Sequence, residues 1–224
     1  LFADRKQRNA DDMAGLVRIT VPDLPDEHAV LRELLTALQV YPKLVLDWRR
    51  DTVRLNVVQE QIDIGVRIGH LADSRLIARK IGETCEKIVM APDLLRRLGK
   101  PKDFADLQKN YPLAAVLNHN NGRADTWYIN ENLQFTPAKP HFVGSHIHNA
   151  MQAALAGNAV SQQLDWVVAP YLLNGELVEL FAEVPKIRWP VSIYRPQRVV
   201  TPMRVKVVFD LLAEILGKRF ELPV

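Results

Sequence analysis

Three segments of this sequence place the start of a predicted helix directly after a predicted strand end; they are Pro25-Asp26, Ser145-His146 and Thr201-Pro202. The first N–H groups of a helix have no partner within the helix and carry a partial positive charge, so they can hold a small anion without covalent chemistry. Arg67 and His146 would add positive charge, whereas Asp23, Asp26 and Glu27 would oppose an anion. We therefore expect a small, carboxylate-bearing metabolite to bind, with the alternative that these residues only cap helices or form turns.

Three histidines, His141, His146 and His148, fall within eight residues and raise the question of a metal site. His146 and His148 are two positions apart on a predicted helix, so they point to different sides, and no Cys or carboxylate joins them at ligand spacing. The sequence also lacks a nucleophile elbow, a phosphate-binding glycine loop and a zinc-protease helix. We expect no metal, no cofactor and no catalytic residue.

The stretch from Asp51 to Ile81 organises the first part of the chain. It opens with a short helical pattern, in which Thr52 is a plausible N-cap and Val53, Val57 and Val58 form the apolar stripe. The apolar period then switches to two from Ile62 to Ile68, which predicts a strand that ends at Gly69. A strand that ends in Arg-Ile-Gly at a loop is typical of the ligand-facing edge of an open α/β sheet, although a half-buried strand with a solvated Arg67 fits equally well.

The flanking segments alternate between strand and helix patterns, which is the signature of a parallel sheet covered by helices. In the first half we predict a strand at Leu16–Val21 and then a helix that Asp23 caps. In the second half we predict a hairpin at Trp127–Ile129 and Leu133–Phe135, and a helix over His146–Ala156 that Ser145 caps. Further helices cover Leu164–Leu173 and the last segment, where Thr201 is the cap, Pro202 the first helical residue and Gly217 the end.

Composition is that of a folded soluble protein: 48% of the 224 residues are hydrophobic and 25% are charged. The net charge of +3 is spread along the chain, and pairs such as Arg49-Arg50 do not form a nucleic-acid surface.

The single cysteine, Cys85, excludes an intrachain disulfide and fits a reducing compartment; a structural role is more common for such a residue than redox sensing. No apolar run is long enough to span a membrane, and no signal peptide appears. Because the chain begins at Leu1 in a polar stretch, we interpret it as a fragment.

Several short motifs in the same order along the chain resemble the effector-binding half of LysR-type transcriptional regulators. The run QIDIGVRIG is followed by LADSRLIARKI and then by IVMAPDLLRRLGKPKDFADL, and further similarity comes from AALAGNAV, NGELV and Tyr194-Arg195-Pro196. The matching positions are Glu60, Asp63, Val66, Arg67, Gly69, Asp73, Ser74, Leu76, Ala91, Pro92, Leu95, Gly99, Pro101, Asp106 and Leu107. The resemblance extends from about Ala14 to Leu216.

The resemblance implies an α/β fold of the type 2 periplasmic-binding-protein-like class, in which two Rossmann-like subdomains are joined by two crossover strands. Residues 1–13 would then be a residual linker. Subdomain I would comprise residues 14–88 and 188–224, and subdomain II would be inserted as residues 89–187. The chain would cross between them near Ile88 and near Arg188.

The same resemblance implies an effector-sensing and oligomerisation domain that binds a small metabolite in the cleft between the subdomains, and the three helix starts predict that this metabolite is anionic. The binding residues would be Asp23, Leu24, Arg67, Ile68, Gly69, Asn118, Gly144, Ser145, His146 and Thr201. Antiparallel pairing would set the helix at His28–Leu38 against the helix at His146–Ala156 of a second copy, in a homodimer or tetramer. Contacts would come from Arg32, Gln39, Asn149 and Gln152.

In this interpretation the protein is cytoplasmic, bacterial and not bound to membranes, and DNA is bound only through a winged helix-turn-helix that this chain lacks. One alternative with the same architecture is a solute-binding protein of a transport system, which would need a signal peptide or a lipid-anchor cysteine upstream. Another alternative, an α/β enzyme, would need a cluster of perturbed ionisable groups in the cleft.

Overall fold

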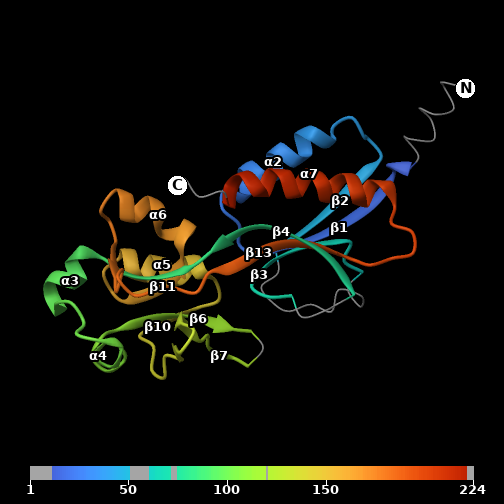
Figure 1. The fold of residues 1–224 in the computed structure, drawn as a ribbon. Coiled ribbons are helices and arrows are strands. Elements are labelled where there is room, and N and C mark those ends of the chain that lie inside the picture. The colour runs from blue at the N-terminus through green and yellow to red at the C-terminus, as the bar shows by residue number, and fades with distance from the viewer. Residues whose placement is uncertain (1–11, 51–60, 72–74, 120, 221–224) are drawn as a thin grey trace, which may run out of the picture. The chain divides into compact units, whose positions relative to one another are not determined.

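The computed structural model describes residues 12–50, 61–71, 75–119 and 121–220 (Figure 1). The helix predicted from Thr52 and the motif positions Glu60, Asp73 and Ser74 lie outside the described residues. The chain divides into two compact units. The first unit is Leu1–Glu83 with Trp189–Val224, and the second unit is Thr84–Arg188.

The first unit is built on a five-stranded sheet in the order β2-β1-β3-β13-β4. Its strands are β1 (Gly15–Val21), β2 (Leu44–Arg50), β3 (Ile64–Ile68), β4 (Leu76–Thr84) and β13 (Trp189–Pro196). Strand β1 runs parallel to both β2 and β3, whereas β13 runs antiparallel to β3. The carboxyl ends of β1 and β3 therefore meet at one edge of the sheet, where the sequence predicted a ligand-facing loop.

Two helices, α2 (Glu27–Leu38) and α7 (Met203–Phe220), lie side by side in the first unit (Figure 1). An ion pair of 2.8 Å between Arg219 Nη2 and Glu33 Oε2 joins them. Helix α2 buries Val30, Leu34 and Leu38, but its Leu35 is 49% exposed. Leu35 therefore lies on an exposed face of α2 that also carries His28, Arg32 and Thr36.

Several predicted helix boundaries are wrong, among them those of α2 and α7. The N-cap position of α2 is Asp26, in the left-handed region at φ 49°, because the Asp23 carboxylate pairs with Arg50 instead. Helix α7 starts at Met203 rather than Pro202, and it continues through Gly217. Burying Phe220 one turn later outweighs the cost of about 1 kcal/mol for a glycine within a helix.

The second unit contains a sheet in the order β10-β6-β11-β5-β12, with β7 paired to β6, and a separate hairpin of β8 and β9. Its strands are β5 (Glu86–Met90), β6 (Leu113–Asn118), β7 (Arg123–Ala124), β8 (Trp127–Asn130), β9 (Leu133–Phe135), β10 (Phe142–Gly144), β11 (Val160–Leu164) and β12 (Val178–Leu180). Its helices are α3 (Pro92–Leu98), α4 (Phe104–Asn110), α5 (Ile147–Leu155) and α6 (Asp165–Leu173). The predicted hairpin is confirmed as β8–β9.

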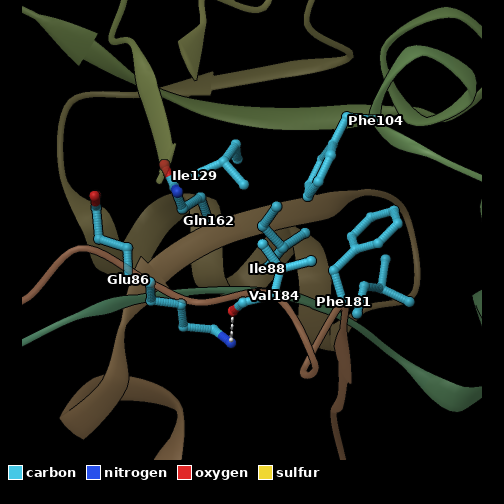
Figure 2. A pocket seen from close by; sticks show the side chains of 9 residues that line it. Glu86, Ile88, Phe104, Ile129, Gln162, Phe181 and Val184 are labelled. Carbon is cyan, nitrogen blue, oxygen red and sulfur yellow. Dashed lines mark hydrogen bonds between the residues drawn. The ribbon is translucent and has the colours of Figure 1, made fainter. Parts of the chain in front are cut away.

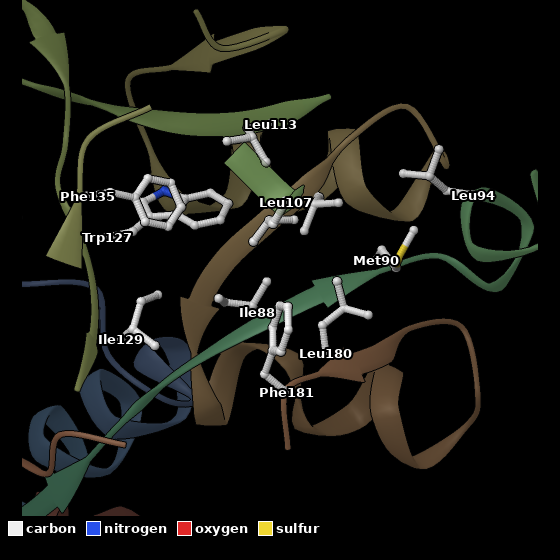
Figure 3. Packing of buried hydrophobic residues seen from close by; sticks show 11 residues of the cluster. Ile88, Met90, Leu94, Leu107, Leu113, Trp127, Ile129, Phe135, Leu180 and Phe181 are labelled. Carbon is white, nitrogen blue, oxygen red and sulfur yellow. The ribbon is translucent and has the colours of Figure 1, made fainter. Parts of the chain in front are cut away.

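The largest buried cluster of the second unit contains Ile88, Met90, Leu107, Leu113, Leu180 and their neighbours (Figure 3). Two aromatic pairs belong to it. Ring centroids are 4.2 Å apart for Phe104 and Phe181, and 5.3 Å apart for Trp127 and Phe135. This core packs helix α4 and the β8–β9 hairpin against β5, β6 and β12.

Strand β11 is an element that the sequence did not reveal, because three of its five residues are polar. Ser161, Gln162 and Gln163 are all buried, and Gln163 is only 2% exposed. The amide nitrogens of both glutamines donate hydrogen bonds: Gln163 Nε2 donates to Ser161 Oγ at 2.7 Å, and Gln162 Nε2 donates to Tyr128 O at 2.9 Å. Hydrogen bonds thus replace the apolar pattern that normally marks a buried strand.

Candidate functional site

At the carboxyl edge of the first unit's sheet, the structure brings together two of the predicted groups of site residues. Strands β1 and β3 pair in parallel through Ile19 with Ile64 and Thr20 with Gly65, so Asp23-Leu24 and Ile68-Gly69 follow neighbouring strand ends. Gly69 has φ +100°, a backbone conformation that favours glycine, and its N–H donates to Pro190 O at 2.8 Å. Arg67 is partly buried and lies on β3, two residues before Gly69.

The start of α2 is surrounded by carboxylates that already have a cation. Asp23 is buried, and its Oδ1 lies 3.3 Å from Arg50 Nη1. The same guanidinium pairs with Glu27, which also accepts a hydrogen bond of 3.2 Å from Trp48 Nε1. The carboxylates of Asp23 and Glu27 would repel a ligand anion, and the charge of Arg50 is already used to pair with them. This edge is therefore suited to polar or apolar contacts more than to neutralising the charge of a ligand.

Thr201 does not lie at this edge. Helix α7, which follows Thr201, begins beside the amino end of β1. A hydrogen bond of 3.2 Å from Arg204 Nε to Leu16 O places it there. Strand β1 is seven residues long, so its amino end near Leu16 and its carboxyl end near Asp23 are about 20 Å apart. Thr201 Oγ1 accepts a hydrogen bond of 3.1 Å from Arg195 Nη1. The prediction that all three helix starts serve one site is therefore wrong for Thr201-Pro202, since β13 is antiparallel to β3 and returns the chain to the other edge.

In the second unit, Asn118, Gly144, Ser145 and His146 meet at the carboxyl edge of the sheet. Strands β6 and β10 are parallel, with Val116 opposite Gly144. The loop after β6 reaches the loop after β10, where His119 Nε2 lies 3.2 Å from Ser145 O. Asn118 is held by a hydrogen bond of 3.1 Å from its Nδ2 to Asp125 Oδ1. Four predicted residues therefore come from two neighbouring strand ends.

Helix α5 starts at this edge without a side-chain cap among the described residues. The N-cap position is His146 in an extended conformation, rather than the predicted Ser145, and the side chains of both residues are exposed. His146 O accepts from Asn149 N at 3.0 Å, while the first-turn N–H groups of Ile147 and His148 precede any acceptor within the helix. The helix therefore presents its partial positive charge to whatever occupies this edge.

Gly144 permits the close approach of α5 to β10. A Cβ on this glycine would lie 2.5 Å from Asn149 Cβ and 3.0 Å from Phe142 Cε1. Its φ lies outside the left-handed region, so the requirement is for space rather than for backbone freedom. This packing brings the first turn of α5 directly onto the strand end.

A cavity elsewhere in the second unit does not qualify as the effector site (Figure 2). It is lined by Glu86, Ile88, Phe104, Ile129, Gln162, Leu180, Phe181, Val184 and Lys186. Its volume is about 10 Å³, which is the space that one water molecule needs. An organic effector does not fit there.

Asp165, which the sequence did not single out, is a buried carboxylate beside Cys85. It accepts hydrogen bonds from the Cys85 N–H and from the Cys85 thiol. Burial, together with this carboxylate, raises the pKa of the Cys85 thiol to about 11. The thiolate is the reactive form, so Cys85 is buried and inert at neutral pH, as a structural cysteine is.

Within the described ranges, no group of three or more His, Cys, Asp or Glu side chains is arranged to hold a metal ion. Of the helices in the part of the chain that the structure describes, none is long and apolar enough to cross a membrane.

Residues 10–217 match the family described as "LysR substrate binding domain". Among curated proteins, the chain is similar to the HTH-type transcriptional regulator CrgA of Neisseria meningitidis serogroup C, with 26% identity over 181 residues. The match covers 79% of this chain and 59% of that relative. It is also similar to the HTH-type transcriptional regulator DmlR of Escherichia coli K12, with 23% identity over 92% of this chain and 67% of the relative.

Solved structures with the same fold include the regulatory domain of CrgA from Neisseria meningitidis, with a TM-score of 0.72 and 22% identity over 91% of this chain and 100% of that one. The full-length virulence activator AphB of Vibrio cholerae, a member of the LTTR family, matches with a TM-score of 0.73 and 18% identity. That match covers 96% of this chain and 74% of AphB. The type 2 periplasmic-binding-protein-like α/β fold is thereby confirmed.

Proposed function

This chain belongs to the LysR substrate-binding domain family, and from that premise we propose that it senses a small anionic metabolite for a bacterial transcriptional regulator. The relatives are named as transcriptional regulators, which favours this role over the solute-binding alternative. The match covers 59% of the first relative's length, and we propose that this domain does not itself contact DNA.

The observation that carries the proposal is the uncapped start of α5 at the edge formed by β6 and β10. A carboxylate there accepts hydrogen bonds from first-turn N–H groups, and the helix dipole favours its charge. Asn118 and His146 supply polar side chains at the same edge, and Gly144 lets the backbone approach closely. We propose that this edge, rather than the acidic start of α2, receives the charged group of the effector.

The remaining predicted contacts, from Asp23, Leu24, Arg67, Ile68 and Gly69, stay part of the proposal as contacts to the uncharged part of the ligand. Such a ligand acts on the regulator only through different affinities for two conformations. A metabolite that bound both conformations equally would produce no response, however tightly it bound.

Calorimetric titration with a panel of small organic acids, each paired with its amide or alcohol analogue, tests this function. We expect at least one acid to bind with an affinity that its uncharged analogue lacks. If every acid fails to bind, or if the uncharged analogues bind as tightly, the proposed anion sensor is wrong.

We also propose an antiparallel dimer in which α2 of one copy contacts α5 of the other. The four residues assigned to that contact, Arg32, Gln39, Asn149 and Gln152, are all exposed. Each unit also has an edge strand with exposed apolar side chains: Val45 on β2, and Phe142 and Val143 on β10. Edge strands of this kind are protected when they are covered by a partner. A cytoplasmic location is part of the same proposal.

A further inference from the structure

Gln163, on strand β11 of the second unit, carries a buried oxygen that lacks a donor. The residue is 2% exposed, and its Oε1 accepts no hydrogen bond from any residue that the structure describes. The other end of the amide is fixed: Nε2 donates to Ser161 Oγ at 2.7 Å, and Ser161 Oγ donates to Ala114 O at 3.5 Å. Because the hydroxyl hydrogen of Ser161 is used on Ala114, the amide turns its nitrogen to Ser161 and leaves its oxygen for another donor.

The register of β11 places Gln163 on the face of the sheet that α5 and α6 cover. Two residues earlier, Ser161 lies opposite Val89 of β5, and side chains two apart on a strand share a face. Val89 belongs to a buried cluster with residues of both helices: Met151, Ala154, Val167 and Val168. Ile147, the first residue of α5, packs against the same cluster. Gln163 and the start of α5 therefore lie on one side of the sheet.

Gln163 is also level with the start of α5 along the direction of the strands. Ser161 pairs with Ala114 on β6, and Ala114 pairs with Phe142 on β10. Two residues further on, Gln163 is level with Gly144, the last residue of β10 before the turn into α5. Two strand spacings, about 10 Å, separate these two backbone positions. The glutamine side chain and a small acid bound at the helix start together span that distance.

The neighbouring glutamine, Gln162, faces the opposite side of the same strand. Its Nε2 donates to Tyr128 O at 2.9 Å, and its side chain lines the small cavity with Ile88 and Ile129 (Figure 2). That side is filled by the β8–β9 hairpin and the core beneath it. A donor for Gln163 Oε1 must therefore enter from the carboxyl edge of the sheet, where the candidate site lies.

Trp166, in the first turn of α6, supplies a second buried polar atom. Its Nε1 has no hydrogen-bond partner in the part of the chain that the structure describes. The indole nitrogen only donates, whereas the amide oxygen of Gln163 only accepts. A hydroxyl group does both, so it can satisfy either atom. An ammonium group is disfavoured, because the neutral amide of Gln163 cannot offset the loss of its hydration in a buried site.

We propose that Gln163 is a specificity-determining residue that accepts a hydrogen bond from a hydroxyl group of the effector, so that the effector is a hydroxy acid. Its carboxylate lies at the start of α5, and its hydroxyl group points along the sheet to Gln163. This inference rests on the proposed function and extends its anion site within the second unit. A buried acceptor discriminates strongly between ligands, because an analogue without the donor leaves it unpaired.

Calorimetric titration of the parent with hydroxy acids and their analogues tests this inference. The hydroxy acids are lactate, malate and 3-hydroxybutyrate, and the deoxy analogues are propionate, succinate and butyrate. Alanine, aspartate and 3-aminobutyrate carry an ammonium group in place of the hydroxyl group. We expect one hydroxy acid to bind about tenfold or more tightly than its deoxy and amino analogues. Equal binding within each set would overturn the inference.

Two glutamine variants then assign the preference to one side chain. Gln163→Met keeps the length of the side chain and removes the amide, so it should still bind the acid but lose the preference for the hydroxyl group. Gln162→Met is the matched control, because it changes a buried glutamine of the same strand that faces the hairpin, and it should keep the preference. A purely structural role for Gln163 would weaken the binding of both ligands by the same factor.

Thermal melting checks that each variant folds, and Gln163→Leu replaces Gln163→Met if the latter does not. A preference that survives in the Gln163 variant, or that Gln162→Met loses equally, would overturn the role of Gln163 and leave the anion site intact. If the parent binds none of the acids, the inference and the proposed function both fail. The comparison of hydroxy and deoxy acids in the parent decides the hydroxyl preference even if neither Gln163 variant folds.

Discussion

The Nε2 atom of His119 lies 3.2 Å from the carbonyl oxygen of Ser145. This contact ties the loop after β6 to the residue that precedes the N-cap of α5. It therefore fixes the start of the helix relative to the neighbouring strand end, which is the part of the structure that we assign to the effector.

Replacing His119 by alanine should loosen the start of α5. We expect the free energy of unfolding to fall by about 0.5–1.5 kcal/mol, the usual net contribution of one hydrogen bond, as measured by urea denaturation. Binding of an organic acid identified by calorimetry should weaken in the same variant. His28→Ala, an exposed histidine of α2, is the control and should change neither quantity. Equal effects of the two variants would remove this role from His119.

Gly65 is predicted to tolerate no side chain. A Cβ would lie 2.2 Å from Tyr194 Cζ, and the buried ring cannot move away without disturbing the sheet. We expect Gly65→Ala to destabilise the protein by about 1–3 kcal/mol in urea unfolding, the usual cost of overpacking.

Gly217→Ala is the control for that measurement, because nothing lies within 4 Å of its added Cβ and it sits inside helix α7. This variant should stabilise the protein by about 0.4–1 kcal/mol, since it reduces the freedom of the unfolded chain. A loss of stability in Gly217→Ala would show that α7 does not continue past Leu216.

Cys85 should react slowly with iodoacetamide in the folded protein. Its pKa of about 11, raised by burial and by Asp165, lies two units above the ordinary value of 9.0, so the thiolate is about a hundredfold scarcer at pH 8. Mass spectrometry should detect rapid alkylation only after unfolding in urea. Similar rates in both states would contradict the buried position and restore redox sensing as an explanation for this cysteine.

Glu179 should make stability depend on pH. Burial raises its pKa, but hydrogen bonds from Lys186 and Lys87 outweigh burial and hold it below the ordinary 4.5. A carboxyl group with a depressed folded pKa contributes stability above its unfolded pKa, and that contribution is lost as the pH falls through the folded value. The difference in unfolding free energy between the parent and Glu179→Gln should therefore be largest near neutral pH and shrink below pH 4.5. A difference that does not vary with pH would contradict this assignment.

Self-association should depend on the exposed apolar residues of the proposed dimer surface. Leu35→Glu and Val143→Glu place a charge on that surface, so sedimentation should show more monomer for each. Val199→Glu changes a fully exposed valine in the segment before α7 and should sediment like the parent. A parent protein that is monomeric at high concentration would rule out the dimer.

The sequence predicted much of the fold because most strands keep an apolar period of two and most helices keep a stripe. It missed β11, where buried glutamines replace apolar residues and form side-chain hydrogen bonds that no period reveals. It also stopped α7 at Gly217, because the packing of Phe220 against the sheet is not visible in the local pattern. Both errors come from tertiary contacts that override local preference.

The resemblance implied Asn118 and Gly144 as site residues, and the structure places them at neighbouring ends of the parallel strands β6 and β10. The place of Thr201 was not predictable, since a helix start in the sequence does not reveal which edge of the sheet it reaches. The direction of β13, set by its antiparallel pairing with β3, decides that question. Asp165 was equally hidden, because its partners Thr84 and Cys85 are about eighty positions away in the chain.

The most direct test of the central claim is a calorimetric titration of Ser145→Asp and Ser145→Asn with an organic acid that binds the parent. A carboxylate at the start of α5 should repel the ligand while stabilising the helix by about 0.3–1 kcal/mol, so affinity falls as stability rises. Ser145→Asn has the same shape without the charge and should bind like the parent. Unchanged affinity in Ser145→Asp would contradict the assignment of the anion to this helix start.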